Sequence, residues 1–302
     1  MSDALPFQAP ATAVLPDETI PAPLPEEAHY LPKRRRPWTW LIAALTAAAA
    51  VGVVMVPRFG PLLAPAAAIA LVVLLIRQRR SVPRLVKRND EATALLAAGR
   101  VAEAADEFEA LTREGRSVPL LHALFVFNRA VTYHQAGQLE KALSLLAAVV
   151  RSGWSRANQI PNFHGLLLAE AATCLALFGD LVAADRLARR AQEHIGEPQR
   201  GRVMAAEVVI LLRSGQPKAA ADHVRVHYFS AEGTVGARGA RALRLLWAFA
   251  LSQLPTEQAA GVDLERLLAG TYPHAEHEFD HLTVRWPELA RFVGERLEQR
   301  PL

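Results

Sequence analysis

The sequence predicts an all-α protein in which a two-helix hairpin precedes a solenoid of helical pairs. Two observations support this fold class: two long apolar runs near the N-terminus carry no charged side chain, and a helical pattern that ends in glycine recurs four times after them. A third observation is an amphipathic pattern near the C-terminus, which predicts a helical cap. We expect five regions along the chain: residues 1–36, 37–76, 77–88, 89–229 and 230–302.

Residues 1–36 are expected to form a disordered tail. The segment is rich in proline and alanine, and its first 32 residues carry five acidic side chains and no basic one. Few large apolar side chains are present, so the segment cannot bury enough surface to offset the entropy lost on ordering. It ends in a basic cluster, residues 33–36, that leads into the second region.

Residues 37–76 are predicted to form a transmembrane helical hairpin, because each of their two apolar runs approaches the ~20 residues that a helix needs to cross a bilayer. Basic residues flank the hairpin on both sides and include a basic neck, residues 77–88; such residues stay in the cytoplasm and contact anionic membrane lipids. We therefore expect an integral membrane protein with both termini cytoplasmic. The alanine- and arginine-rich composition favours a bacterial inner membrane. A cleaved signal peptide and a re-entrant hairpin remain alternatives.

The distribution of charge argues against binding to nucleic acid. The formal net charge is +4, but the excess of basic residues lies beside the apolar runs, and residues 89–302 hold 23 basic and 25 acidic side chains. A nucleic-acid-binding domain needs a basic patch of its own. Cys174 is the only cysteine, and its apolar surroundings in the sequence predict a buried, unreactive side chain.

From residue 89 to residue 229 the sequence repeats. In each unit a glycine ends one helix, and an alanine five residues later lies on the inner face of the next helix. The glycines are 38, 42 and 36 residues apart, a spacing typical of a helical solenoid. They are Gly99, Gly137, Gly179 and Gly215.

The best-defined unit runs from Phe127 to Gly137 and places Ala130 and Tyr133 at fixed offsets before the glycine. This pattern resembles the tetratricopeptide repeat, whose unit is a helix-turn-helix of ~34 residues. The resemblance implies a right-handed α-solenoid in which the first helix of each pair lines a concave groove that holds a protein or peptide segment. Carried over by position, the groove residues are Asn89, Thr93, Phe127, Asn128, Val131, Glu170, Thr173 and Arg202.

Near the C-terminus the sequence contains a His-Glu-x-x-His string, from His277 to His281. On a helix, these two histidines would lie one turn apart and could hold zinc, with Glu278 as the base for a bound water and His274 as a third ligand. We expect instead a solvated, charge-rich helix within the cap, and therefore no metal site and no cofactor. The competing interpretation is a zinc-dependent membrane hydrolase.

The functional prediction is a membrane-tethered adaptor or scaffold that binds a protein partner at the cytoplasmic face of the membrane. We expect no catalytic residues, since the sequence contains neither a phosphate-binding glycine-rich loop nor a nucleophile elbow. A structural subunit of a membrane complex is a further alternative. The sequence leaves the partner, the biological process and the oligomeric state open.

Overall fold

The computed structural model describes residues 18–23, 31, 82–157, 159–196, 199–255 and 262–298. Within these ranges the secondary structure is entirely helical, as predicted, and consecutive helices pack against each other in pairs. The first helix covers residues 82–97. It is followed by α3 (Val101–Glu114), α4 (Pro119–Gln135), α5 (Leu139–Ser152), α6 (Phe163–Phe178), α7 (Leu181–His194), α8 (Arg200–Arg213), α9 (Pro217–Ser252), α10 (Leu264–Ala269), α11 (Asp280–Thr283) and α12 (Pro287–Val293).

The helix pairs turn at the four glycines that the sequence pattern singled out. Gly99, Gly137, Gly179 and Gly215 all have positive φ angles, between 71° and 108°, which side chains other than glycine rarely adopt. At Gly137, for example, the N–H of the next residue donates to the carbonyl of Tyr133 at 2.8 Å and so closes the helix end. The alanines five residues after the glycines are fully buried between helices.

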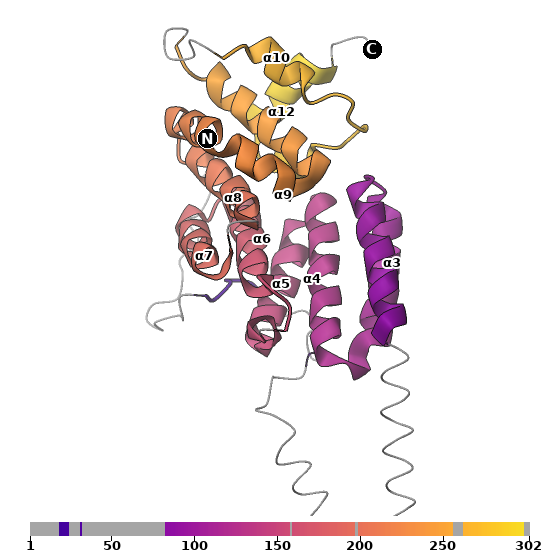
Figure 1. Cartoon of the computed structure of the whole chain (residues 1–302). Coiled ribbons are helices and arrows are strands. Elements are labelled where there is room, and N and C mark those ends of the chain that lie inside the picture. Colours follow the sequence, from indigo (N-terminus) through magenta and orange to yellow (C-terminus); the bar gives the residue numbers. More distant parts are fainter. Residues whose placement is uncertain are drawn as a thin grey trace, which may run out of the picture.

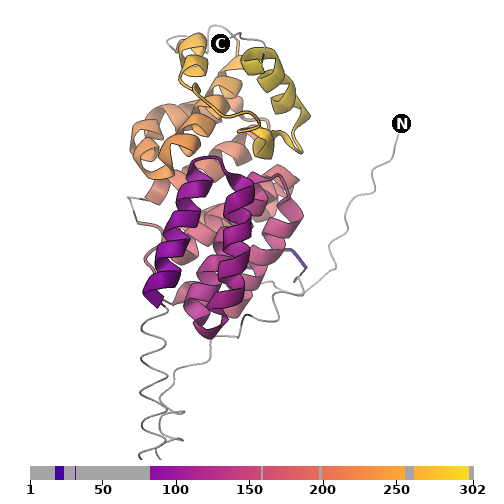
Figure 2. The same cartoon turned by 90° about the vertical axis from the view of Figure 1, so that its right-hand side faces the viewer.

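The helices of successive pairs lie roughly side by side, and the C-terminal helices α10 and α12 adjoin α9 at one end (Figure 1). Each of the helices α3 to α9 contacts its neighbour in sequence, and α6, the first helix of its pair, also packs on α8 and α4. In the second view the helix over residues 82–97 and α3 stand together at the end of the array (Figure 2). Most buried apolar side chains form one core, while Phe108 and Phe125 anchor a smaller core beneath α3.

Helix α9 is kinked in the middle. Gly236 has φ 71° and ψ 171°, which is not a helical conformation, and the helical path continues on both sides of it. The bend lies within one long element, in which Gly233, Gly236 and Gly239 follow one another at intervals of three residues. The bend places the second half of α9 beside α10.

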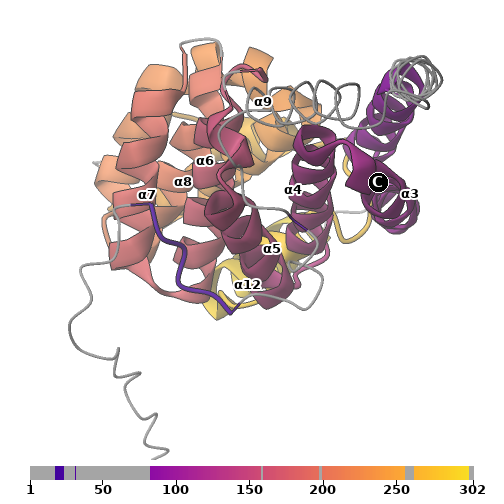
Figure 3. The same ribbon diagram turned by 90° about the horizontal axis from the view of Figure 1, so that it is seen from below.

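The N-terminal residues that the structure describes pack on the helical domain. Residues 18–23 run beside α7 (Figure 3), and the side chain of Ile20 is only 1% exposed. Leu31 is also buried in the main core. This part of the region that we expected to be a disordered tail therefore contacts the domain.

The predicted location as an integral protein of a bacterial inner membrane, with both termini cytoplasmic, is corrected by the structure. None of the helices in the ranges given above is long and apolar enough to cross a bilayer. The apolar runs that suggested the hairpin, residues 37–76, lie outside the described residues. Of the basic neck, only residues 82–88 are described, and they belong to the first helix, with Pro83 in its first turn.

Candidate functional site

A cavity of about 330 Å³ lies between the first helices of the successive pairs. The helix over residues 82–97, α4, α6 and α8 line one side, and α9 around its bend and α11 close the other. The C-terminal region thus covers part of the face where we expected a continuous groove. The cavity walls are mainly apolar and include Leu96, Val131, Leu166, Val209, Val235 and Leu246.

Five of the eight predicted groove residues line this cavity: Thr93, Val131, Glu170, Thr173 and Arg202. The other three have structural contacts beside it. Asn128 donates its side-chain N–H to the Asn89 side-chain oxygen at 2.7 Å, which ties α4 to the helix over residues 82–97. Phe127 is buried and packs edge-on against Phe163, with ring centroids 5.5 Å apart.

A cluster of three titratable side chains lies at the floor of the cavity: His134 and Glu170 line it, and Cys174 is buried beside them. His134, in the last turn of α4, places Nδ1 at 2.6 Å from Oε1 of Glu170 on α6. Cys174 follows Glu170 by four residues, so both side chains lie on the same face of α6, which points at α4. One ligand-capable atom from each of the three residues lies within 4.8 Å of those of the other two.

The three side chains determine each other's protonation. Burial alone would lower the pKa of His134, but the neighbouring Cys174 sulfur and Glu170 carboxylate raise this pKa well above its ordinary value. Burial works against ionisation of Glu170, but the His134 imidazolium lowers its pKa. Burial raises the pKa of the Cys174 thiol.

Opposite this floor, Arg238 lines the cavity just after the bend in α9. Its Nη2 donates to the backbone carbonyl of Glu278 at 3.2 Å, but its buried Nε and Nη1 have no hydrogen-bond partner within the described part of the chain. The Glu278 carboxylate is instead bound by both Nε and Nη2 of Arg241, at 2.7 and 3.0 Å. Burial lowers the pKa of Arg238, although the group stays cationic. The cavity thus combines apolar walls with spare hydrogen-bond donors.

The His-Glu-x-x-His string does not adopt the arrangement that a zinc hydrolase requires. His277 has a positive φ of 62° and precedes α11, whereas His281 lies within α11, so they are not one turn apart on a single helix. The side chain of His277 is 73% exposed, while His281 is buried and lines the cavity. Glu278 is neutralised by Arg241 and is not a free base. His274 packs between aromatic rings.

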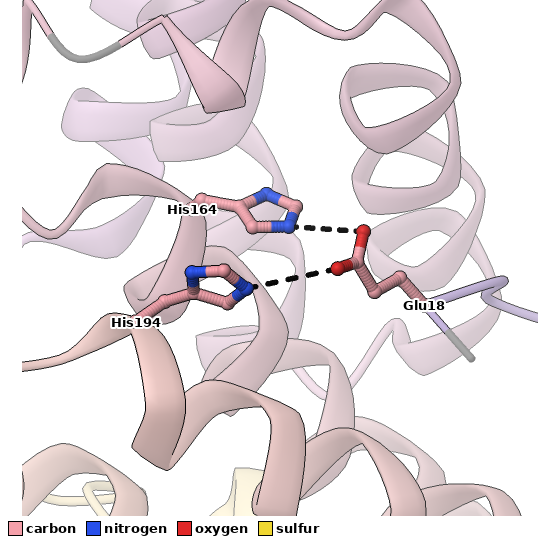
Figure 4. Close-up of side chains that lie close together, drawn as sticks. All are labelled: Glu18, His164 and His194. Carbon is pink, nitrogen blue, oxygen red and sulfur yellow. Dashed lines mark ion pairs between the residues drawn. The ribbon is translucent and has the colours of Figure 1, made fainter. Parts of the chain in front are cut away.

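A second cluster holds the N-terminal segment to the domain (Figure 4). The carboxylate of Glu18 lies 3.2 Å from Nε2 of His164 and 3.6 Å from Nε2 of His194. It also pairs with Arg190 at 3.1 Å and with Arg156. Because two guanidinium groups already neutralise the carboxylate, this cluster is an electrostatic anchor for the segment and a poor environment for a metal cation.

The sequence predicted part of the site but not the polar side chains His134, His281 and Arg238. Glu170 was expected in the groove, and the Glu170-x-x-x-Cys174 spacing on an apolar helix was the available signal for a second polar group beside it. No sequence pattern connects His134, His281 and Arg238, which come from three separate elements. No protein-family profile matches this chain, and no matching protein was found among curated proteins or solved structures.

Proposed function

We propose that this protein is an adaptor or scaffold that binds a short segment of another protein in the cavity between its helix pairs. In this proposal the pairs form a right-handed solenoid similar to tetratricopeptide arrays. Two observations support the solenoid: the four glycine turns with their buried alanines, and the packing of α6 on both α4 and α8. The proposal needs no reaction and no membrane anchor.

The observation that carries the proposal is Arg238 at one side of an apolar cavity. A buried N–H without a partner costs about 1–3 kcal/mol, so a ligand that offers an oxygen acceptor to Nε and Nη1 would remove this cost. The apolar walls would take an aliphatic or aromatic side chain. We therefore expect a segment in which a carboxylate or carbonyl acceptor lies beside an apolar side chain.

The size of the cavity limits how much of a partner it can hold. Its volume of about 330 Å³ is near the lower end of the ~300–1,000 Å³ range of ligand pockets. One or two side chains, or a chain end, fit such a volume. The rest of the partner would contact the exposed rim of the cavity, where Thr93 and Arg202 lie.

Site-specific photo-crosslinking in the native host tests the proposal. A photoreactive residue at Thr93, on the cavity rim, should trap one partner protein, whereas the same residue at Val182, exposed on α7, should not. Replacing Arg238 by Gln should reduce the yield of the Thr93 adduct. The proposal would be contradicted if adducts formed equally at both positions. It would also be contradicted if Arg238→Gln left the yield of the Thr93 adduct unchanged.

A further inference from the structure

We propose that His134, Glu170 and Cys174 form a binding site for Zn²⁺ at the floor of the cavity. This inference concerns a metal site and does not depend on the proposed protein partner. Imidazole, carboxylate and thiolate are the three ligand types that zinc uses in proteins. Here they come from two adjacent helices, with Glu170 and Cys174 one turn apart on α6 and His134 facing them from α4.

The geometry of the cluster is close to that of a tetrahedral zinc site. With bonds of ~2.0–2.3 Å, ligand atoms around zinc lie roughly 3.3–3.8 Å apart. The three ligand-capable atoms here all lie within 4.8 Å of one another, so side-chain rotations alone can bring them to a shared ion. The short hydrogen bond between His134 and Glu170, at 2.6 Å, opens when the ion enters between them.

The three side chains of the cluster are buried and contact one another. His134 is 4% exposed, its Nδ1 lies 2.6 Å from Oε1 of Glu170, and its ring also interacts with the Cys174 side chain. An ion that takes the place of the proton between Nδ1 and Glu170 would therefore meet the Cys174 sulfur as its third ligand.

The charge of the cluster also suits a divalent cation. Zinc binds a neutral imidazole, a carboxylate and a thiolate. The two negative ligands balance the charge of Zn²⁺, so the loaded cluster has a net charge of zero and no uncompensated charge is buried beside the Arg238 guanidinium.

The fourth coordination position faces the cavity, where His281 is the nearest additional ligand. Its ring lies 5.4 Å from that of His134. Its Nδ1 lies 3.0 Å from the backbone carbonyl of Glu278, and the N–H···O bond there fixes the tautomer in which Nε2 has a free lone pair.

Calorimetry of the full chain, freed of metal by a chelator and titrated with ZnCl₂, tests the site. We expect one zinc ion per chain, with release of protons on binding, because the Cys174 thiol must ionise to bind the metal. The proton count comes from titrations in two buffers of different ionisation enthalpy. Cys174→Ala should weaken zinc binding roughly 100-fold or more. The control is His194→Gln, which disrupts the other cluster of three ligand-type residues and should leave the affinity unchanged.

Cobalt binding to the wild-type chain provides an independent test, which remains usable if the Cys174→Ala variant fails to fold. Co²⁺ bound to the wild-type chain should show the intense near-ultraviolet absorption of a cobalt–thiolate bond, since Cys174 is the only cysteine. Absence of this band in the folded wild-type protein overturns the proposal, as does zinc binding that is equally strong in Cys174→Ala. The crosslinking result at Thr93 does not depend on zinc, so the two proposals fail separately.

Discussion

Replacing Gly201 with alanine should destabilise the protein through the contact between α8 and α9. A Cβ atom at Gly201 would lie 2.8 Å from Cα and 2.9 Å from the carbonyl oxygen of Ala231, and 2.3 Å from Oγ1 of Thr234. The first two atoms belong to the backbone and cannot rotate away. The helices would have to separate locally, since carbon atoms in contact are normally ~3.5–4.0 Å apart.

The size of the effect follows from two opposing contributions. Forcing an additional methyl group into a packed interface costs about 1–3 kcal/mol. Alanine recovers up to about 1 kcal/mol within a helix, because it restricts the unfolded chain more than glycine does. We therefore expect a net loss of about 1–2 kcal/mol. For a domain of this size, that corresponds to a fall in Tm of roughly 2–8 °C.

Gly233→Ala is the matched control, because it makes the same substitution in the neighbouring helix. A Cβ at Gly233 would meet no heavy atom within 4 Å, and its φ is not in the left-handed region. This variant should gain about 0.4–1 kcal/mol. Urea unfolding followed by circular dichroism at 222 nm measures both variants. If Gly201→Ala proves as stable as Gly233→Ala, the close approach of α8 and α9 is refuted.

Three further predictions concern pH, the N-terminal segment and the smaller core. Burial, with a contribution from Arg116, lowers the pKa of His122 to about 4, so the unfolded chain, with a pKa near 6.5, binds more protons as the pH falls. The contribution of His122 to stability should therefore fall between about pH 6.5 and 4, by about 2 kcal/mol at pH 5. A urea series with His122→Phe, which should lose less stability than the wild type by about this amount, checks this. Glu18→Lys should release residues 18–23, seen as faster hydrogen exchange there, whereas Pro21→Lys at an exposed position should not. Phe108→Ala should cost about 3–5 kcal/mol in urea unfolding, because this ring is fully buried; a cost below 1 kcal/mol would contradict that packing.

The turns between helix pairs could be predicted from the sequence, because each depends on one residue type. Only glycine readily adopts the left-handed conformation at a helix end, so Gly99, Gly137, Gly179 and Gly215 mark the turns wherever the helices pack. The burial of the following alanines was predictable for the same local reason. The bend in α9 was not, since three glycines occur at intervals of three residues and only the packing determines that Gly236 takes the non-helical conformation.

The inner-face residues of the candidate site could be predicted from the sequence, but the partners of its charged side chains could not. Position within a repeat places Val131 and Thr173 on the inner face of their helices, and both line the cavity. The partners of charged groups depend on contacts between distant segments. Glu278 looked like a free base within a metal-binding string, yet Arg241, 37 residues away, binds it through two hydrogen bonds. Glu278 is therefore not the unpaired carboxylate that the string suggested.

The packing of the N-terminal segment on the domain could not be predicted from the sequence either. Averaged over residues 1–36, the composition is too polar and too rich in proline to predict order. Residues 18–23 nevertheless pack on the domain, because Ile20 enters the main core while Glu18 meets two arginines and two histidines. Average composition cannot detect such a contact, since Glu18 finds its charged partners on residues 154–156, α6 and α7, which become neighbours only in the folded domain.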